Sequence, residues 1–217
     1  MCVITHRKAV RGISGDMQHH TAVPKRKRDQ FVEDLRFLKS WASNPLRTGA
    51  VSPSSRELAE RMAQDVDPAH PGILVELGPG TGVITRALID RGFDASRLVL
   101  VEYNPKFCRM LKEAFPGVTV LRGDAYQLRD HLRHLGNPQL AGVVTGLPLF
   151  TRPLPQRVRL INDCLEALDP GRPIVQFSYA LVPPVPMGHG DYTIDVSKWV
   201  WRNLPPARVW TYRRPRG

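Results

Sequence analysis

The stretch that decides the fold is Leu74-Val75-Glu76-Leu77-Gly78-Pro79-Gly80-Thr81-Gly82. It begins in the short apolar run 73–77, which is typical of a buried strand. The residues after it, 83–91, have helical spacing and stop at Gly92. Glycines between a strand and a helix allow a tight turn and let a ligand approach the backbone closely. The stretch therefore predicts a strand, a ligand-binding turn and a helix in succession.

The pattern of strand followed by helix continues along the chain. Further strands are predicted at 98–101, 118–121, 140–145 and 174–179, and helices at 105–115, 125–135 and 154–168. This alternation favours an α/β, Rossmann-like fold with a doubly wound and mostly parallel sheet. Near the end, the segments 196–202 and 208–212 are rich in Val and Trp and flank Asn203-Leu204-Pro205-Pro206. We expect them to form an antiparallel hairpin that completes a seven-stranded sheet.

The N-terminal part has a different character. Residues 1–28 show no periodicity and end in the basic cluster Lys25-Arg26-Lys27-Arg28, so they are interpreted as a flexible basic tail. Residues 29–66 are expected to hold two helices, an amphipathic one over 29–43 and a second one from Ser52-Pro53 to about Ala63. The turn between them, 48–51, is a candidate cover for a bound cofactor. The catalytic domain is predicted to span 67–217.

Charge is the unusual bulk property of the 217-residue chain. Lys and Arg number 31 against 20 acidic residues, which gives a net charge of +11. Such an excess favours an anionic partner, either nucleic acid or a membrane surface, and does not choose between them; simple solubility is the plain alternative. The 3 cysteines are far apart, so neither a disulfide framework nor a metal site is predicted. No apolar run approaches the roughly 18–20 residues of a membrane span, and no secretory leader is recognised, so a cytoplasmic location is expected.

Three acidic residues follow the predicted strand ends in order. Glu76 precedes the glycines and is placed to meet a cationic group, directly or through water. Glu102 ends the next strand, where its two oxygens can accept both hydroxyls of a ribose. Asp124 follows the third strand and can accept from an adenine amino group, while the backbone N–H of Ala125 faces a ring nitrogen. A surface cap or salt bridge explains any one of these carboxylates; all three in order are harder to explain in that way.

Taken together, Glu76, Gly78, Gly80, Gly82, Glu102, Asp124 and Ala125 resemble the motifs of the class I methyltransferases that use S-adenosylmethionine (SAM). The resemblance implies the methyltransferase form of the Rossmann-like fold, with SAM as cofactor. NAD, which glycine-rich turns also bind, is disfavoured because nothing in the sequence proposes a site for hydride transfer.

The methyl acceptor is expected beside the end of the fourth strand, at Thr145-Gly146-Leu147-Pro148-Leu149-Phe150. Gly146 is predicted to lie against the cofactor there. The ribosomal RNA adenine dimethylases, which resemble this chain in overall pattern, carry Asn or Asp at the position of Gly146 and an aromatic residue at that of Leu149. Those side chains hold and stack a flipped adenine. Both are replaced here, although Phe150 lies one place later.

A closer resemblance is to the bacterial phospholipid N-methyltransferases, over most of residues 31–214. It rests on Phe37-Leu38-Lys39-Ser40-Trp41, Thr48-Gly49-Ala50-Val51-Ser52-Pro53-Ser54, the residues from Glu76 to Gly82, Gly146-Leu147-Pro148-Leu149, Phe177-Ser178-Tyr179 and Trp201-Arg202-Asn203-Leu204-Pro205-Pro206-Ala207. The resemblance implies N-methylation of phosphatidylethanolamine, up to three times, toward phosphatidylcholine. The expected location is then the inner face of the plasma membrane, with no nucleic-acid partner.

Membrane physics supports the same function. A basic amphipathic helix over 25–41 can lie in the lipid headgroup layer, and each Lys or Arg near an anionic leaflet contributes about 1 kcal/mol. The alternative is that this helix packs on the domain. Other functions remain open: RNA adenine N-methylation, and a membrane-binding protein that keeps the fold without turnover.

The acceptor amine must lose a proton before it attacks a methyl group. Tyr179, at the end of the fifth strand, and His189, in the loop after it, are the candidate catalytic residues. A core edge for Tyr179 and an ordinary turn for His189 are the alternatives.

Overall fold

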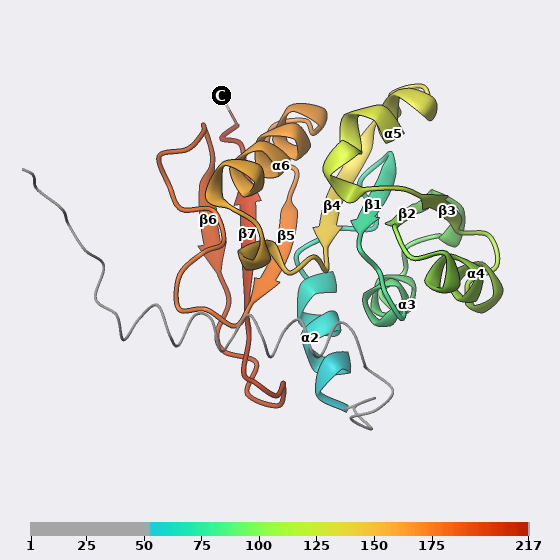
Figure 1. Ribbon diagram of the computed structural model, residues 1–217, viewed down its shortest axis with the longest axis horizontal. Coiled ribbons are helices and arrows are strands. Elements are labelled where there is room, and N and C mark those ends of the chain that lie inside the picture. The colour runs from blue at the N-terminus through green and yellow to red at the C-terminus, as the bar shows by residue number, and fades with distance from the viewer. Residues whose placement is uncertain (1–52, 217) are drawn as a thin grey trace, which may run out of the picture.

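A computed structural model describes residues 53–216, and side chains are placed from Arg56 onward. The described residues form a seven-stranded sheet in the order β3-β2-β1-β4-β5-β7-β6. The strands are β1 Ile73–Leu77, β2 Leu98–Glu102, β3 Thr119–Arg122, β4 Leu140–Thr145, β5 Ile174–Ser178, β6 Thr193–Val196 and β7 Arg208–Arg213. The first five strands pair in parallel, whereas β7 is antiparallel to both of its neighbours. The predicted Rossmann-like sheet with an antiparallel C-terminal hairpin is confirmed (Figure 1).

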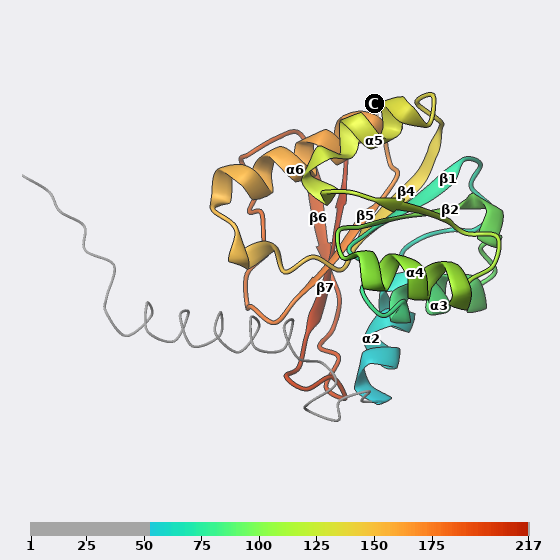
Figure 2. The ribbon, with the colours of Figure 1, turned by 45° about the vertical axis from the view of Figure 1, so that its right-hand side comes forward.

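Helices cover both faces of the sheet. One face packs against α5 (Leu128–His134) and α6 (Leu154–Ala167), and the other against α2 (Pro53–Ala63) and α3 (Val83–Asp90), with α4 (Pro105–Ala114) over β2 and β3. The two layers lie on opposite sides of the strands in Figures 1 and 2. Single-turn 3₁₀ segments, η1 Ala95–Arg97, η2 Ala125–Gln127 and η3 Leu149–Thr151, lie in the connections.

The central strands are apolar because the sheet is covered on both sides. Every residue of β2 and β4 is buried. Along β1, Val75 and Leu77 pack toward α5 and α6, while Leu74 packs toward α2 and α3. Glu76 alternates with them and is therefore directed toward the α2 and α3 layer. A carboxylate at that position is unusual, since a strand buried on both faces is expected to be continuously hydrophobic.

The C-terminal hairpin exists, but its first strand lies earlier than the sequence predicts. Residues 196–202 were expected to pair with 208–212, whereas β6 is Thr193–Val196. Beyond it only Val200 bridges to Ala207, and Ser197 continues the ladder by donating its N–H to the Val209 oxygen. The β propensity of Val and Trp was misleading because the two prolines before Ala207 have no N–H to donate, so the chain forms a projecting loop there. The Leu204–Pro205 peptide bond in this loop is cis.

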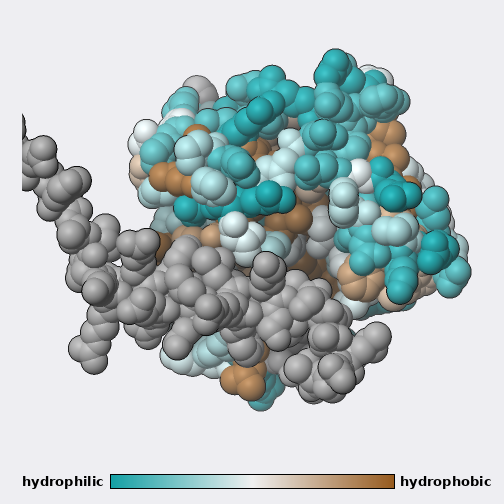
Figure 3. All heavy atoms as spheres, viewed as in Figure 1, coloured by the Kyte–Doolittle hydropathy of each residue, from teal (hydrophilic) through white to brown (hydrophobic). Residues whose placement is uncertain are grey.

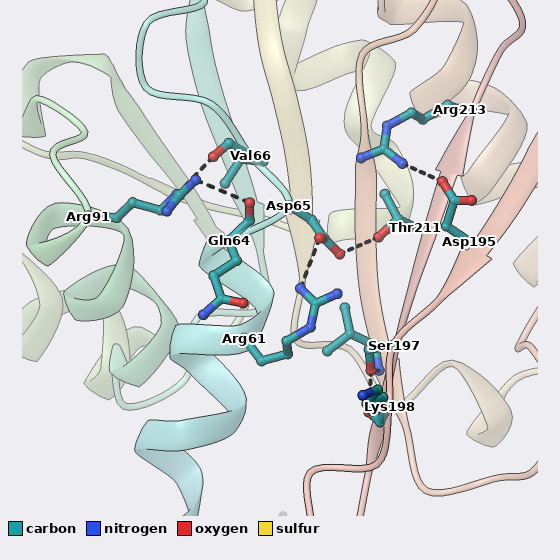
Figure 4. A network of polar contacts seen from close by, with 11 residues as sticks. Arg61, Gln64, Asp65, Val66, Arg91, Asp195, Ser197, Lys198, Thr211 and Arg213 are labelled. Atoms are coloured by element: carbon teal, nitrogen blue, oxygen red, sulfur yellow. Dashed lines mark hydrogen bonds and ion pairs between the residues drawn. The ribbon is translucent and has the colours of Figure 1, made fainter.

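A hydrogen bond links the end of α2 to strand β7. Asp65, just after α2, accepts from the Thr211 hydroxyl at 2.6 Å and from the Arg61 guanidinium at 2.8 Å. Figure 4 shows Asp65 between these two partners, with the Arg213–Asp195 ion pair joining β7 to β6 nearby. The predicted helix from Pro53 to Ala63 is confirmed, and it packs against the β-sheet core. The predicted tail 1–28, the helix over 29–43, the turn 48–51 and the docking segment 25–41 lie outside the described residues.

Candidate cofactor and acceptor site

Parallel pairing brings the ends of three neighbouring strands to one edge of the sheet. β1 lies between β2 and β4, and β3 lies beyond β2, so Glu76, Glu102 and Asp124 occupy adjacent strand ends. Backbone hydrogen bonds continue into the loops: Gly78 N–H donates to Val101 O and Gly146 N–H to Leu77 O, both at 2.9 Å. The sequence-predicted cofactor residues therefore lie on one edge, which is where ligands bind in open α/β sheets.

The glycine turn has a left-handed backbone at each of its three glycines. Their φ angles are 69° at Gly78, 55° at Gly80 and 80° at Gly82. A Cβ on Gly78 would lie 2.6 Å from Leu147, and one on Gly82 would lie 2.5 Å from Phe115. A Cβ on Gly80 would meet nothing within 4 Å, so this glycine borders open space. Gly78 and Gly82 thus allow close packing, while Gly80 presents backbone to a ligand.

Glu102 holds the glycine turn in place. One carboxylate oxygen accepts from the Gly80 N–H at 3.1 Å, and the other accepts from the Asn104 N–H at 2.7 Å. The side chain is only 8% exposed. Each carboxylate oxygen has a second lone pair, so both can still accept from the hydroxyls of a ribose. This backbone role of Glu102 was not visible in the sequence.

Asp124 caps the segment that follows β3. One of its carboxylate oxygens accepts from the Tyr126 N–H at 3.0 Å, which starts η2. The His131 ring contacts the Asp124 carbonyl oxygen at 2.9 Å, and a Cβ on Gly123 would collide with that ring. Ala125 is buried directly after Asp124. The turn is therefore held rigidly at the end of the sheet where an adenine is predicted.

Glu76 is fully buried and has one partner. Its Oε2 accepts from the Thr85 hydroxyl of α3 at 2.7 Å, and its Oε1 has no hydrogen-bond partner among the described residues. Burial raises the pKa of Glu76 to about 7, with Thr85 opposing the rise and the charge of Glu102 adding to it. A buried carboxylate with an unpaired oxygen is costly on its own, and a cationic ligand would offset that cost. The Thr85 contact was not predicted, because only the packing of α3 on β1 creates it.

The loop after β4 has no room for a polar side chain at its first residue. A Cβ on Gly146 would lie 2.7 Å from the Gly78 carbonyl oxygen, so Gly146 serves as the close-packing neighbour of the glycine turn. Leu149 is 1% exposed and belongs to the core. The face of Phe150 carries the Arg157 guanidinium at 4.9 Å from its ring centroid.

The loop after β4 is also held by Gln176 of β5, a residue that was not predicted from the sequence. It lies in β5, is 1% exposed, and donates from Nε2 to the Leu147 carbonyl oxygen at 3.1 Å. Its Oε1 is buried and has no partner within the described part of the chain. A polar residue inside an apolar strand is the only sequence signal that could have found it.

The two predicted catalytic residues lie apart. Tyr179 follows β5 and packs with the core cluster on the α2 side of the sheet. Burial raises the pKa of its phenol, and a hydrogen bond with Asn203 opposes that rise. His189 is exposed, and its carbonyl oxygen accepts from the Asn162 side chain of α6, on the other face. The structure does not bring Tyr179 and His189 together, and their roles stay predictions.

The site fits the cofactor that the sequence predicts. Glu76 offers a buried anionic oxygen to a cationic amino group, Gly80 offers open backbone, and Glu102 and Asp124 offer acceptors at the next two strand ends. These are the donors and acceptors that an amino acid, a ribose and an adenine require in that order. In the described range, no group of three or more His, Cys, Asp or Glu is arranged to hold a metal ion.

No family model matches the chain. It is 29% identical over 182 residues to an ornithine lipid N-methyltransferase of Singulisphaera acidiphila, covering 82% of this chain and 94% of that one. It is 30% identical over 191 residues to ribosomal RNA small subunit methyltransferase A of Myxococcus xanthus, with 81% of this chain matched. The chain spans only 62% of the length of the latter protein.

Solved structures share the fold. N-methyltransferase NodS from Bradyrhizobium japonicum, in complex with S-adenosyl-L-homocysteine, has a TM-score of 0.57 at 15% identity and covers 83% of this chain and 98% of its own. The 1,6-didemethyltoxoflavin-N1-methyltransferase of Burkholderia thailandensis has a TM-score of 0.59 at 12% identity and covers 90% and 92%. The chain therefore has the fold of the class I SAM-dependent methyltransferases, for which SAM is the expected cofactor.

Proposed function

We propose that the chain transfers methyl groups from SAM to the amine headgroup of a membrane phospholipid, phosphatidylethanolamine and its methylated intermediates, toward phosphatidylcholine. The matched relative named as an ornithine lipid N-methyltransferase supports a lipid acceptor, because this chain spans 94% of its length. The site is proposed to work at the inner face of the plasma membrane, with residues 25–41 on the anionic lipid surface. Among the described residues, no helix has the length and apolarity needed to span a bilayer.

The observation that carries the choice of acceptor is the contact between Gly146 and Gly78. A Cβ at position 146 would lie 2.7 Å from the Gly78 carbonyl oxygen, so no amide or carboxylate can be presented there to an adenine amino group. Leu149, at the stacking position, is buried in the core instead of facing a base. A small flexible amine needs neither an amide clamp nor an aromatic platform, and its own lipid anchor holds it at the surface.

Positioning is the main contribution of the chain to the reaction. When bound, SAM supplies a methyl group on a sulfonium sulfur, and the attacking nitrogen must lie in line with the bond that breaks. Glu76, Gly80 and Glu102 would hold the donor, and the hydrogen bonds from Gly80 to Glu102 and from Thr85 to Glu76 fix these groups in place. On the acceptor side, the buried Gln176 Oε1 is an unpaired hydrogen-bond acceptor beside Leu147. We propose that it receives an N–H of the headgroup amine and orients the lone pair.

Proton loss from the headgroup ammonium precedes the attack. An alkylammonium resembles that of lysine, with a pKa of about 10.4, and desolvation lowers this value. Tyr179 has a raised pKa because it is buried, so its phenol is protonated at neutral pH and acts as a hydrogen-bonding group there. We propose that the ammonium loses water as it enters the site beside Leu149, the buried residue of the 146–150 loop, and that its lowered pKa lets it pass its proton to the bulk solvent before the attack.

RNA adenine N-methylation is the second candidate function. Matched relatives named as ribosomal RNA methyltransferases favour it, and so does the net charge of +11. The Gly146 and Leu149 observations oppose it.

Labelled SAM separates the two functions. The full chain is incubated with anionic vesicles containing phosphatidylethanolamine, with vesicles containing ornithine lipid, or with ribosomal RNA. Label in phosphatidylethanolamine, and afterwards in its methylated products, is expected. Label in ornithine lipid alone would correct the headgroup, and label in RNA alone would overturn the lipid proposal. A Gln176→Glu variant serves as a probe of the acceptor side, because it keeps the size of the side chain and changes only its charge.

A further inference from the structure

One exposed feature has no role in the site described above. The loop over residues 198–207, between β6 and β7, exposes Trp201 at 71% and Leu204 at 87%. The loop after β5 exposes Leu181 at 77% and Val182 at 58% beside it. Large apolar side chains this exposed, gathered on neighbouring loops, mark an interaction surface when they form a patch. We call Leu181, Val182, Trp201 and Leu204 the apolar tip.

The 198–207 loop holds its apolar side chains outward by burying the residues between them. Val200 and Asn203 are each 5% exposed and Ala207 is fully buried, so these three residues anchor the loop to the domain. Val200 bridges to Ala207, and the Asn203 amide donates to the Pro205 carbonyl oxygen at 2.8 Å. The exposure of Trp201 and Leu204 is therefore imposed by the fold, and binding at this tip costs little ordering entropy.

The two segments that carry the apolar tip hold basic residues and no acidic ones. Residues 196–217 contain six Lys and Arg residues and no Asp or Glu, and residues 180–190 contain none of these four. Lys198 and Arg202 are exposed on the loop itself. The nearest acidic residue before the loop, Asp195, is paired with Arg213. An anionic and apolar partner matches both properties of this surface.

The apolar tip lies at the same edge of the sheet as the candidate site. Tyr179 follows the end of β5, which is parallel to β4 and β1, and it reaches the loop through its hydrogen bond with Asn203. Figures 1 and 2 both place the β6–β7 loop beyond the carboxyl ends of the strands, beside the first turns of α2. Figure 3 shows hydrophobic atoms at this lower extremity of the molecule.

We propose that the apolar tip inserts into the headgroup layer of an anionic bilayer and turns the site edge toward the lipid. Trp is favoured at the membrane interface because its ring is amphipathic, and Lys and Arg beside it are attracted to anionic headgroups. A second copy of this chain would bring the same basic residues face to face, so a membrane suits the surface better than a dimer. The inference rests on the proposed function for its purpose, since a headgroup amine must reach the site edge without leaving the bilayer. It places a docking element on the folded domain, separate from residues 25–41.

Vesicle binding tests the apolar tip. The full chain and a Trp201→Ser/Leu204→Ser double variant are sedimented with vesicles of phosphatidylethanolamine and phosphatidylglycerol. The double variant is expected to partition roughly tenfold more weakly or worse, because two interfacial apolar side chains are lost. The matched control is Met187→Ser, which removes an apolar side chain that is 59% exposed from the loop over α6 and should bind as the parent does. Equal partitioning of the double variant and the parent overturns the proposal.

Tryptophan fluorescence locates the contact. The chain has 4 tryptophans, and a Trp41→Phe background removes the one in the other predicted docking segment. Brominated lipids are expected to quench the fluorescence in that background, and adding Trp201→Phe should remove most of the quenching while keeping the fold. Unchanged quenching after Trp201→Phe contradicts insertion. The alternative is that a second copy of the chain binds at the apolar tip, and light scattering without lipid tests it by measuring the oligomeric state. If the parent is a dimer and the double variant is a monomer, the apolar tip serves self-association and the proposal is overturned.

These measurements are independent of methylation. Weak vesicle binding by the double variant, together with label from SAM only in RNA, would support the docking surface and reject the lipid function. If phosphatidylethanolamine is labelled and the double variant binds vesicles as the parent does, the lipid function is supported and the docking surface is rejected.

Discussion

At the scale of single residues, the buried Glu76 is expected to make both stability and cofactor binding depend on pH. Burial is the main reason that its pKa rises from 4.5 to about 7, and this net shift corresponds to a cost of about 3 kcal/mol for keeping the carboxylate ionised at high pH. The folded chain binds the proton more tightly than the unfolded chain, so stability is highest below pH 4.5 for this group and falls as pH rises to about 7. We expect a Glu76→Gln variant to lose this dependence. The melting temperature of Glu76→Gln relative to the parent should therefore rise between pH 5 and pH 8.

The same group predicts the opposite trend for the cofactor. A cationic amino group binds the ionised carboxylate, so the affinity of the parent for SAM should fall as pH drops below about 7, and Glu76→Gln should bind weakly at every pH. Calorimetric titrations at several pH values measure this. Thr85→Val, which removes the hydroxyl that stabilises the charge, should shift the midpoint upward. A midpoint that stays in place in Thr85→Val would show that another group titrates.

Gly146 gives a steric test at the residue scale. In Gly146→Ala the new Cβ would press on the Gly78 carbonyl oxygen, and a displacement of the glycine turn by about 1 Å can cost about 100-fold in rate. We expect a large loss of kcat/KM with a folded protein. Gly188→Ala is the control, because it adds a methyl at a strained φ of 91° with nothing within 4 Å and far from the turn. Equal activity in the two variants would exclude close packing as the reason for Gly146.

Sequence reasoning worked for residues whose type and position carry the signal. The three glycines and the carboxylates at successive strand ends were placed correctly because parallel strands end at one edge. Gln176 and Thr85 were missed because their roles come from contacts across the sheet and from α3, which spacing alone does not define. Whether Tyr179 shares a cleft with His189 depends on which face each loop follows, and the sequence does not encode that.

At the scale of elements, one carboxylate adds a polar link between α2 and β7 to their apolar packing. Asp65 accepts from the buried Thr211 hydroxyl, and removing it leaves that hydroxyl without its partner. We expect Asp65→Ala to lower the free energy of unfolding by about 1–3 kcal/mol in urea titrations. Arg61→Ala removes only a partly exposed ion pair and should cost less than about 1 kcal/mol. Similar losses in the two variants would mean that the Arg61 ion pair, and not the Thr211 contact, holds α2.

The elements themselves were predictable where hydrophobic period and turn residues agree. Helix α2 was found from its proline start, and β1 to β5 from apolar runs between helices. The first strand of the hairpin was predicted in the wrong place because the Val and Trp residues between 196 and 202 are typical of a strand. In the structure this segment belongs to a projecting loop, where Trp201 is exposed. Trp201, which contributed to the wrong strand prediction, is also part of the apolar tip, because it is exposed where a strand residue of its size is expected to be buried.

At the scale of the whole molecule, SAM is expected to stabilise the fold through Glu102. A ligand that binds only the folded state adds about 2.7 kcal/mol at 100 times its Kd, which raises the melting temperature of a domain of this size by roughly 5–10 °C. Glu102 joins the glycine turn to the end of β2 through Gly80 and Asn104, so Glu102→Ala removes both this link and the acceptors predicted for the ribose. In Glu102→Ala the stabilisation by SAM should nearly vanish, and the apo protein should also melt earlier. Asp94→Ala, which removes a comparable cap distant from the turn, should keep the full shift. If Glu102→Ala keeps the shift of the parent in thermal melts with saturating SAM, the cofactor does not lie across these strand ends, because a ligand held there cannot bind independently of the group that fixes the turn.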